Sequence, residues 1–296
     1  MLINRRRAPS SEISSEKKIG GHKREDEYAA LINGTVIKGT QKGDVRDINQ
    51  NLHSVKGGKK WQVFLYRYET ISNSHFLNIL KSCLDAFPED YDKYVEDRTR
   101  CIALREKLVT EIGKEKVKLM SNKDFLAILG DDQNSYVKAK QSLSIATGNV
   151  CNKLHDKEFL KKFIQEAMFN NTEVDFLAVK SRSDHKFRVF SRPNVINAFA
   201  SRMSPGISKA GKVPEDFNVD GQKTILTYEK LPGKNKNIVE IEIRNDSKQH
   251  YREVRFNMYS EDALNILLED SLCSRKAIVY ENLHFHGDSK EEIRID

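Results

Sequence analysis

The strongest constraint on the fold is a long helical segment in the middle of the chain, with strand-like segments on both sides. From residue 75 to residue 170 the apolar residues recur at helical spacing. Residues 34–57 indicate short strands punctuated by glycines, residues 173–191 indicate a hairpin, and residues 223–259 indicate three strands separated by polar turns. This order predicts a mixed α/β fold with a helical middle layer and a β-rich C-terminal region.

The composition changes along the chain predict four parts. We expect a disordered basic arm over residues 1–18, because this stretch is rich in Arg, Ser and Lys and has no periodicity. A core containing the helical segment follows over residues 19–203 and opens with a helix from His22 to Asn33. Residues 204–222 are rich in Pro, Gly, Ser and Lys, which predicts a loop or linker before a β-rich region at 223–296.

The segment KKWQVFLYRYETI fits two kinds of secondary structure. Its β-branched and aromatic residues suit a strand, but five apolar residues follow helical spacing: Trp61, Phe64, Leu65, Tyr68 and Ile71. We predict a helix here on the strength of the spacing.

Charge and composition limit the class of protein only loosely. Lys and Arg outnumber Asp and Glu by 50 to 43, which gives a pI near 9.0 and suits a polyanionic partner without requiring one. No apolar run approaches the length of a membrane span, and the N-terminus lacks the apolar stretch of a signal peptide, so we expect a cytoplasmic protein. Scattered cysteines at 83, 101, 151 and 273 indicate neither a zinc site nor a disulfide framework.

The residues that carry chemistry lie in the first quarter of the chain. Phosphodiester hydrolysis needs a hard cation held by carboxylates, and a group that orients or deprotonates the attacking water. Asp44 follows a glycine in KGDVRDI, and Lys56 ends the short strand in LHSVKGG twelve residues later. A turn of that length would bring the two side chains together, although an Asp and a Lys beside a polar turn are also common as solvent-exposed hairpin residues.

The stretch from Gly21 to Glu69 resembles the catalytic segment of type II restriction endonucleases of the PD-(D/E)XK superfamily. The likeness rests on a glutamate-bearing helix (REDEYAALIN), then GTQKGDVRD, then HSVKGGKKWQVFLY, and extends to VEIEIRNDSKQHYREVRFNM near the C-terminus. The resemblance implies a mixed sheet flanked by helices, Mg²⁺ as cofactor, Asp44 as a metal ligand, and Lys56 as the residue that polarises the water or the phosphate.

Ser54 departs from the pattern of that superfamily. It stands two residues before Lys56, where Asp or Glu is usual, so a second carboxylate has to come from elsewhere. Some members with S-x-K supply a glutamate twelve or thirteen residues beyond the lysine, and Glu69 stands thirteen beyond Lys56. Glu25 and Glu27 of the first helix are rival ligands, of which Glu25 is preferred, and Asp47 and His53 are interpreted as solvated turn residues.

Two other places compete for function. Asp175, Asp184 and Lys186 reproduce the spelling of an Asp followed by D-x-K, but Ser181–Ser183 lack the apolar residues of a buried strand. The polar turn after EIEIR suits contacts to DNA bases and phosphates, although an ordinary polar sheet face would look the same. The candidate DNA-binding residues there are Arg244, Asn245, Asp246, His250, Tyr251 and Arg252.

The hypothesis from sequence is a Mg²⁺-dependent, site-specific endonuclease of double-stranded DNA. The resemblance implies a homodimer on a short palindrome and a companion DNA methyltransferase in the same system. The alternatives are a DNA-binding protein that does not cut, and a repair or structure-specific nuclease of the same superfamily.

Overall fold

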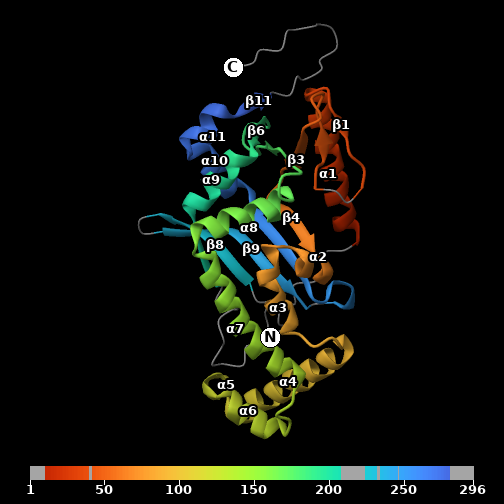
Figure 1. The fold of residues 1–296 in the computed structure, drawn as a ribbon. Helices are drawn as coiled ribbons and strands as arrows, with labels where there is room; N and C mark the ends of the chain where they lie inside the picture. The colour runs from red at the N-terminus through yellow and green to blue at the C-terminus, as the bar shows by residue number, and fades with distance from the viewer. Residues whose placement is uncertain (1–10, 40–41, 208–223, 232–233, 246, 281–296) are drawn as a thin grey trace. The chain divides into compact units, whose positions relative to one another are not determined.

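The chain divides into two compact units in its computed structural model (Figure 1). The residues described are 11–39, 42–207, 224–231, 234–245 and 247–280. The first unit takes its described residues from Met1–Trp61, Met168–Phe199 and Ser260–Asp296, and the second from Gln62–Ala167 and Ala200–Tyr259. Both units are therefore assembled from separate stretches of sequence, and the predicted mixed α/β class is confirmed.

The first unit is built on a six-stranded mixed sheet. Its elements are α1 (Ser11–Leu31), β1 (Thr35–Val36), β2 (Val45–Arg46), β3 (Leu52–Lys56), β5 (Phe176–Lys180), β6 (Phe187–Ser191), α9 (Arg192–Arg202), α10 (Ser260–Glu269), α11 (Ser271–Lys276) and β11 (Ile278–Tyr280). The strand order is β1-β2-β3-β5-β6-β11, in which only β3 and β5 are parallel. Parallel neighbours need a crossover connection, and here the crossover contains the helices of the second unit.

Helix α1 packs against one face of this sheet. Tyr28 and Ala29 form a buried cluster with residues of the four strands β2, β3, β5 and β6, namely Val45, Val55, Ala178, Phe187 and Val189. Removing each such side chain from water stabilises the fold by roughly 1.5–3 kcal/mol. Because successive side chains of a strand point to opposite faces, Ser54 and Lys56 project from the face away from α1.

Helix α1 begins earlier than the sequence predicts and ends close to the predicted stop. The helix begins at Ser11, so residues 11–18 of the expected disordered arm are helical, while residues 1–10 lie outside the described residues. The predicted stop at Asn33-Gly34 is confirmed, since Asn33 has a φ of 51°. A Cβ on Gly34 would lie 2.7 Å from the backbone oxygen of Arg46, so only glycine fits there.

The second unit combines the helical segment with an antiparallel sheet. Its elements are β4 (Lys60–Tyr66), α2 (Tyr68–Asn73), η1 (Leu77–Leu80), α3 (Lys81–Asp85), α4 (Tyr91–Ile112), α5 (Lys114–Leu119), α6 (Asn122–Leu129), α7 (Ser135–Leu154), α8 (Lys157–Phe169), β7 (Met203–Ile207), β8 (Thr224–Leu231), β9 (Lys234–Arg244), η3 (Lys248–His250) and β10 (Glu253–Tyr259). The sheet order is β4-β10-β9-β8-β7. The predicted helical middle and the three predicted strands from residue 223 onward are confirmed.

The helix predicted for KKWQVFLYRYETI is wrong for most of its length. Residues 60–66 form β4, which lies beside β10 in the sheet, and the helix α2 begins only at Tyr68. Trp61, Val63 and Tyr66 are buried while Lys60 and Gln62 are exposed. This segment also has helical spacing, but it forms a strand because it pairs with β10, which lies nearly two hundred residues further along the chain.

The expected linker over residues 204–222 is in part a strand. Ser204–Ile207 belong to β7, which pairs with β8, and residues 208–223 lie outside the described residues. The two compact units also divide the chain at other points than the expected 19–203 and 223–296, because β7–β10 share one sheet with β4.

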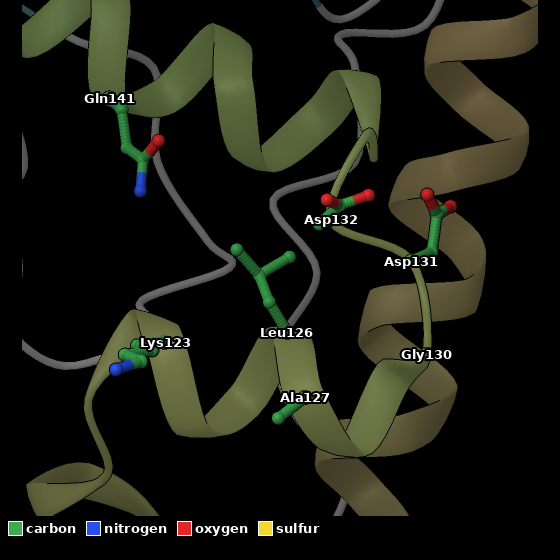
Figure 2. Close-up of a pocket in the computed structure, with 7 residues that line it drawn as sticks. All are labelled: Lys123, Leu126, Ala127, Gly130, Asp131, Asp132 and Gln141. Atoms are coloured by element: carbon green, nitrogen blue, oxygen red, sulfur yellow. The ribbon is translucent and has the colours of Figure 1, made fainter.

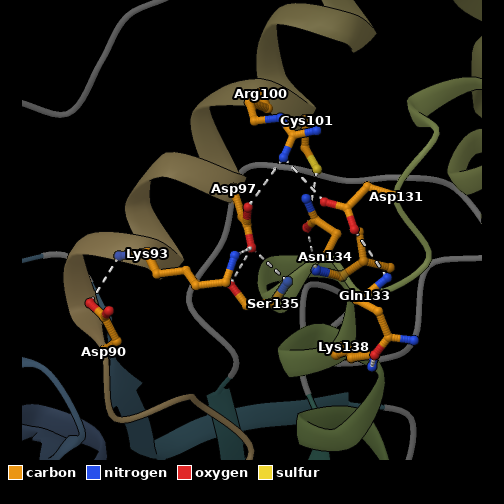
Figure 3. Close-up of polar contacts among 11 residues, drawn as sticks. Asp90, Lys93, Asp97, Arg100, Cys101, Asp131, Gln133, Asn134, Ser135 and Lys138 are labelled. Atoms are coloured by element: carbon orange, nitrogen blue, oxygen red, sulfur yellow. Dashed lines mark hydrogen bonds and ion pairs between the residues drawn. The ribbon is translucent and has the colours of Figure 1, made fainter.

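The helices α4 and α7 are joined by a buried polar junction (Figure 3). The carboxylate of Asp97 is 1% exposed and accepts hydrogen bonds from the backbone N–H of Ser135 at 2.8 Å and from its hydroxyl at 2.6 Å. Asn134 caps α7 by accepting from the N–H of Val137 at 3.2 Å, and it accepts from the Cys101 thiol at 3.5 Å. The first turn of α7 is therefore fixed by α4.

The four cysteines are buried and unpaired. Burial raises the pKa of Cys83 and of Cys101 to about 12. Thiols held protonated in this way pack as small apolar groups and are poor nucleophiles.

Candidate functional site

Asp44 and Lys56 come together at neighbouring strands of the first unit. The strands β2 and β3 are antiparallel with Val45 opposite His53, and the N–H of Asp44 donates to the carbonyl of His53 at 2.8 Å. Asp44 therefore stands beside Ser54. Val45 and Val55 point toward α1, so Asp44, Ser54 and Lys56 share the opposite face of the sheet.

One oxygen of the Asp44 carboxylate is the acceptor for three donors. Oδ2 accepts from the N–H of Val55 at 2.6 Å, from the hydroxyl of Ser54 at 3.3 Å, and from Nζ of Lys56 at 3.4 Å. The side chains of Asp44 and Lys56 are 20% and 18% exposed, so solvent reaches both. From the described residues, Oδ1 receives no hydrogen bond, which leaves one carboxylate oxygen available to a ligand.

Ser54 is buried at 3% exposure, and its hydroxyl donates to the same Asp44 oxygen that Lys56 contacts. Its hydroxyl fixes the rotamer of Asp44 and does not act as a second carboxylate would. A second acidic ligand for a metal ion would therefore have to come from another residue.

His53 occupies a buried network rather than the solvated turn that we expected. It is 5% exposed, its Nδ1 lies 2.9 Å from the hydroxyl of Tyr28, and its Nε2 lies 3.3 Å from Oδ2 of Asp47. The ring also stacks on Phe176, with centroids 4.9 Å apart. Burial lowers the pKa of His53, against the opposing effect of Asp47, so the imidazole is held neutral.

Asp47 in turn organises the loop between β2 and β3. Its carboxylate accepts from the N–H groups of Asn49 and Asn51, at 2.9 and 2.8 Å. Burial acts to raise the pKa of Asp47, but the hydrogen bonds from Asn51 and His53 outweigh it and lower the pKa overall. Asp47 is thus a structural carboxylate that fixes the turn carrying Asp44 to Lys56.

The three candidate glutamates are held in different surroundings. Glu25 lies 3.1 Å from Nδ1 of His22 on α1, and Glu27 binds Nζ of Lys180 through both carboxylate oxygens at 2.6 Å. Glu69 is exposed in the first turn of α2, in the second unit. The helix predicted for this segment would have carried Gln62, Leu65 and Glu69 together, but Gln62 and Leu65 belong to β4 and only Glu69 is helical.

The metal-binding capacity of the site rests on one carboxylate. Among the described residues, no three His, Cys, Asp or Glu side chains are grouped so that they could hold a metal ion. Asp44 alone is compatible with Mg²⁺, because this ion is commonly bound through one or two carboxylates together with substrate phosphate oxygens.

The rival hairpin is a real hairpin, but its acidic residues are separated. Asp175 precedes β5 and pairs with Arg192 at 3.5 Å, whereas Asp184 follows β5 in the turn to β6. A salt bridge to Arg188 lowers the pKa of Asp184 well below its usual range. A five-residue strand is about 17 Å long, so Asp175 and Asp184 do not form a joint site.

The candidate DNA-binding residues of the second unit point largely into the protein. Tyr251 packs in an aromatic cluster whose ring centroids lie 4.9 Å away at Tyr91 and 5.6 Å away at Tyr94. Arg252 is 15% exposed, and it contacts Asp85 at 3.2 Å and lies over the ring of Tyr68. These two side chains stabilise the junction of β10 with the helices.

The other candidate DNA-binding residues differ from one another in their surroundings. Asn245 donates to the hydroxyl of Tyr94 at 2.9 Å, and His250 lies 2.7 Å from Glu253. Arg244 is partly buried, and Asp246 lies outside the described residues. On the same strand pair, Glu242 of β9 forms an ion pair with Arg255 of β10.

A pocket of about 500 Å³ lies elsewhere in the second unit, between α6 and the first half of α7 (Figure 2). It is lined by Lys123, Leu126, Asp131, Asp132 and Gln141, among others. Asp131 is already engaged by Arg100 at 3.1 Å and by the N–H of Gln133. Asp131 is therefore held by the protein itself rather than directed at a ligand.

Comparisons with protein-family models, with curated proteins and with solved structures found no match to this chain.

No helix in the described part of the chain is both long and apolar enough to cross a membrane.

Sequence reasoning missed Arg24 and Lys180, which lie at the same edge as Lys56. Lys180 ends β5 as Lys56 ends β3, and the two strands are parallel with Lys56 opposite Val179. The signal that could have found Lys180 is the shared ending of LHSVK and FLAVK, because parallel neighbours in register finish at the same edge of a sheet.

Proposed function

We propose that this chain is a Mg²⁺-dependent endonuclease of double-stranded DNA, of the PD-(D/E)XK type. One observation carries the proposal: Oδ2 of Asp44 and Nζ of Lys56 are 3.4 Å apart, on one face of a mixed sheet. A carboxylate and an ammonium in contact, both reached by solvent, suit a phosphodiester that must be bound and attacked by water. The mixed sheet with α1 against one face agrees with the core that the resemblance implies.

Each side chain has a defined part in this proposal. Asp44, fixed by Val55 and Ser54, would hold the cation through Oδ1. Lys56 would donate hydrogen bonds to a non-bridging phosphate oxygen or to the attacking water. Mg²⁺, when bound, supplies Lewis-acid stabilisation of the charge that develops on the phosphate.

The proposal includes the partners that the resemblance implies. These are a homodimer on a short palindrome and a companion DNA methyltransferase in the same system; the cytoplasmic location is proposed from the sequence alone. Glu69 remains the first choice for the second carboxylate because of its spacing from Lys56, and Glu25 the second choice.

The alternative of a DNA-binding protein that does not cut is favoured by one observation. Oδ2 of Asp44 already accepts a 2.6 Å hydrogen bond from the Val55 N–H, which is the behaviour of a structural carboxylate. Measuring DNA cleavage in Mg²⁺ distinguishes this alternative from the nuclease.

The proposal predicts that the purified chain cuts supercoiled and linear DNA in Mg²⁺, and that EDTA stops cutting. Asp44→Asn and Lys56→Ala should each lower the cleavage rate by at least about a hundredfold, the scale of losing a positioned acid–base or electrostatic group. The measurement is the rate of product formation on gels, with circular dichroism to check that each variant is folded.

Two further variants act as references in the same assay. Asp184→Ala lies on the rival hairpin, so it should cut at the wild-type rate, and loss of cutting there would move the site to that hairpin. Glu69→Gln should raise the Mg²⁺ concentration needed for cutting. DNA binding without cutting in Mg²⁺ or Mn²⁺ would favour the non-cutting alternative.

A further inference from the structure

Arg24 of α1 crosses directly over Gly57, the residue after Lys56. A Cβ placed on Gly57 would lie 2.8 Å from Cδ and 3.0 Å from Nε of Arg24. Contacts below 3.0 Å cannot be accommodated without movement, so the absence of a side chain at residue 57 makes room for the arginine. The close approach brings a guanidinium to the chain segment that carries Lys56.

Lys180 lies beside Arg24 but its charge is already paired. Its Cβ is 3.5 Å from the same ideal Cβ position on Gly57, and its Nζ binds both oxygens of Glu27 at 2.6 Å. The side chains of Lys180 and Glu27 are only 18% and 27% exposed, so the pair is well shielded from water. The Glu27 carboxylate is therefore already paired with Lys180.

The side chain of Arg24 is partly buried, and it makes no hydrogen bond or ion pair with any residue that the structure describes. A guanidinium presents five N–H donors in a rigid planar fork that matches phosphate oxygens two at a time. A partly desolvated fork with unused donors, at the edge where Lys56 ends, is suited to an anion.

We propose that Arg24 binds a backbone phosphate of DNA next to the phosphate held at Asp44 and Lys56, and that Gly57 is required to admit it. Asp44 and Lys56 lie on one face of the sheet, and Arg24 lies on the other face beside Gly57, which directly follows Lys56 in the chain. A DNA strand presents a charge for every ~3.4 Å of helix axis, so a strand held at this edge offers successive phosphates to both groups. Arg24 is a binding and positioning residue in this scheme, which rests on the proposed nuclease function.

The test is the affinity of the full chain for a short DNA duplex in EDTA, measured by fluorescence anisotropy at several salt concentrations. Arg24→Gln should weaken binding by roughly tenfold, the scale of one charge-assisted hydrogen-bonding group. It should also lower the slope of log K against log salt by about 0.9, as one phosphate contact is lost. Arg24→Lys should keep the slope but lose part of the affinity, because the fork is gone while the charge remains.

Gly57→Ala tests the geometry without changing any charge. It should weaken binding in the same direction as Arg24→Gln, and it should add little in the double variant, because both changes act on one contact. If the losses of DNA affinity from Gly57→Ala and Arg24→Gln add up in the double variant, Gly57 does not act through Arg24. Urea unfolding of each variant shows whether a loss arises from unfolding.

Lys118→Gln is the matched control, since it removes one positive charge from an exposed, paired lysine on α5. An equal fall in slope for Lys118→Gln would show a general charge effect and would overturn the assignment of Arg24. A wild-type slope in Arg24→Gln, with wild-type DNA binding intact, would overturn it while leaving the nuclease proposal standing. If the wild-type chain binds no DNA, both proposals fail together.

Discussion

Two adjacent buried residues, His53 and Ser54, determine what β3 presents on its two faces. Ser54 points toward Asp44 and fixes its carboxylate, while His53 points toward α1 and joins Tyr28 to Asp47. The sequence shows both residues as polar and therefore suggests exposure. The burial of His53 depends on α1 and Phe176 covering its face of the strand, which no local pattern at residue 53 reveals.

The buried neutral state of His53 predicts a dependence of stability on pH. Burial lowers its pKa in the folded chain, whereas the unfolded chain takes up a proton near pH 6.5. Below that pH the unfolded state binds more protons, so the free energy of unfolding should fall as pH falls, by at most about 1.4 kcal/mol per pH unit for one group. The neighbouring Asp47 and Asp175 oppose this effect without reversing it.

The measurement is urea unfolding at pH 7.5 and pH 5.5. His53→Gln should be less stable at pH 7.5 but should lose this part of the pH dependence, while His22→Gln, on the exposed side of α1, should keep it. An unchanged pH dependence in His53→Gln would show that another group causes it.

Among the elements, β4 and the α4–α7 junction show how partners outside a segment decide its structure. The KKWQVFLYRYETI segment has helical spacing and strand-forming residues together, and β10 decides between them. The helices α4 and α7 are each predictable from their apolar spacing. Their contact is not, because it includes the buried carboxylate of Asp97, whose partner Ser135 is thirty-eight residues away in the chain (Figure 3).

Loss of the Asp97 carboxylate should destabilise the helical layer. Asp97→Ala leaves the N–H and hydroxyl of Ser135 without their acceptor and breaks the ion pair with Lys93 at 3.2 Å. Because Lys93 is largely exposed, the loss comes mainly from the unsatisfied Ser135 donors and should be about 1–3 kcal/mol. Thermal or urea unfolding measures the loss, and Asp132→Ala, an exposed residue of the same region, should change stability by less than about 0.5 kcal/mol. Equal stability of the two variants would contradict the role of Asp97.

At the scale of the whole molecule, both units are discontinuous in sequence. The six-stranded sheet needs β3 from one stretch and β5 from another, and the five-stranded sheet needs β4 together with β7–β10. The first unit also draws on α10, α11 and β11 from the end of the described chain. A composition-based boundary at residues 204–222 therefore cuts through one unit and removes part of the other.

Fragments made at that boundary should not fold independently. A fragment of residues 223–296 would contain β8–β10 without β4 or β7, which flank them in the sheet, and would leave their apolar residues exposed. We expect little cooperative unfolding from this fragment alone by circular dichroism, and recovery of structure on mixing with residues 1–203. A cooperatively folded 223–296 fragment would show that the sequence-based division was correct.

The sequence by itself determined the local features: the helical middle, the strands of the C-terminal region, the stop of α1 at Asn33-Gly34 and the closeness of Asp44 to Lys56. Each of these follows from side-chain periodicity or from turn residues within about a dozen positions. Only the tertiary structure decided that residues 60–66 form a strand, that Glu27 binds Lys180, and that Tyr251 and Arg252 are packed inward. Those outcomes depend on strand pairing and burial between residues far apart in sequence, and local periodicity contains no information about such partners.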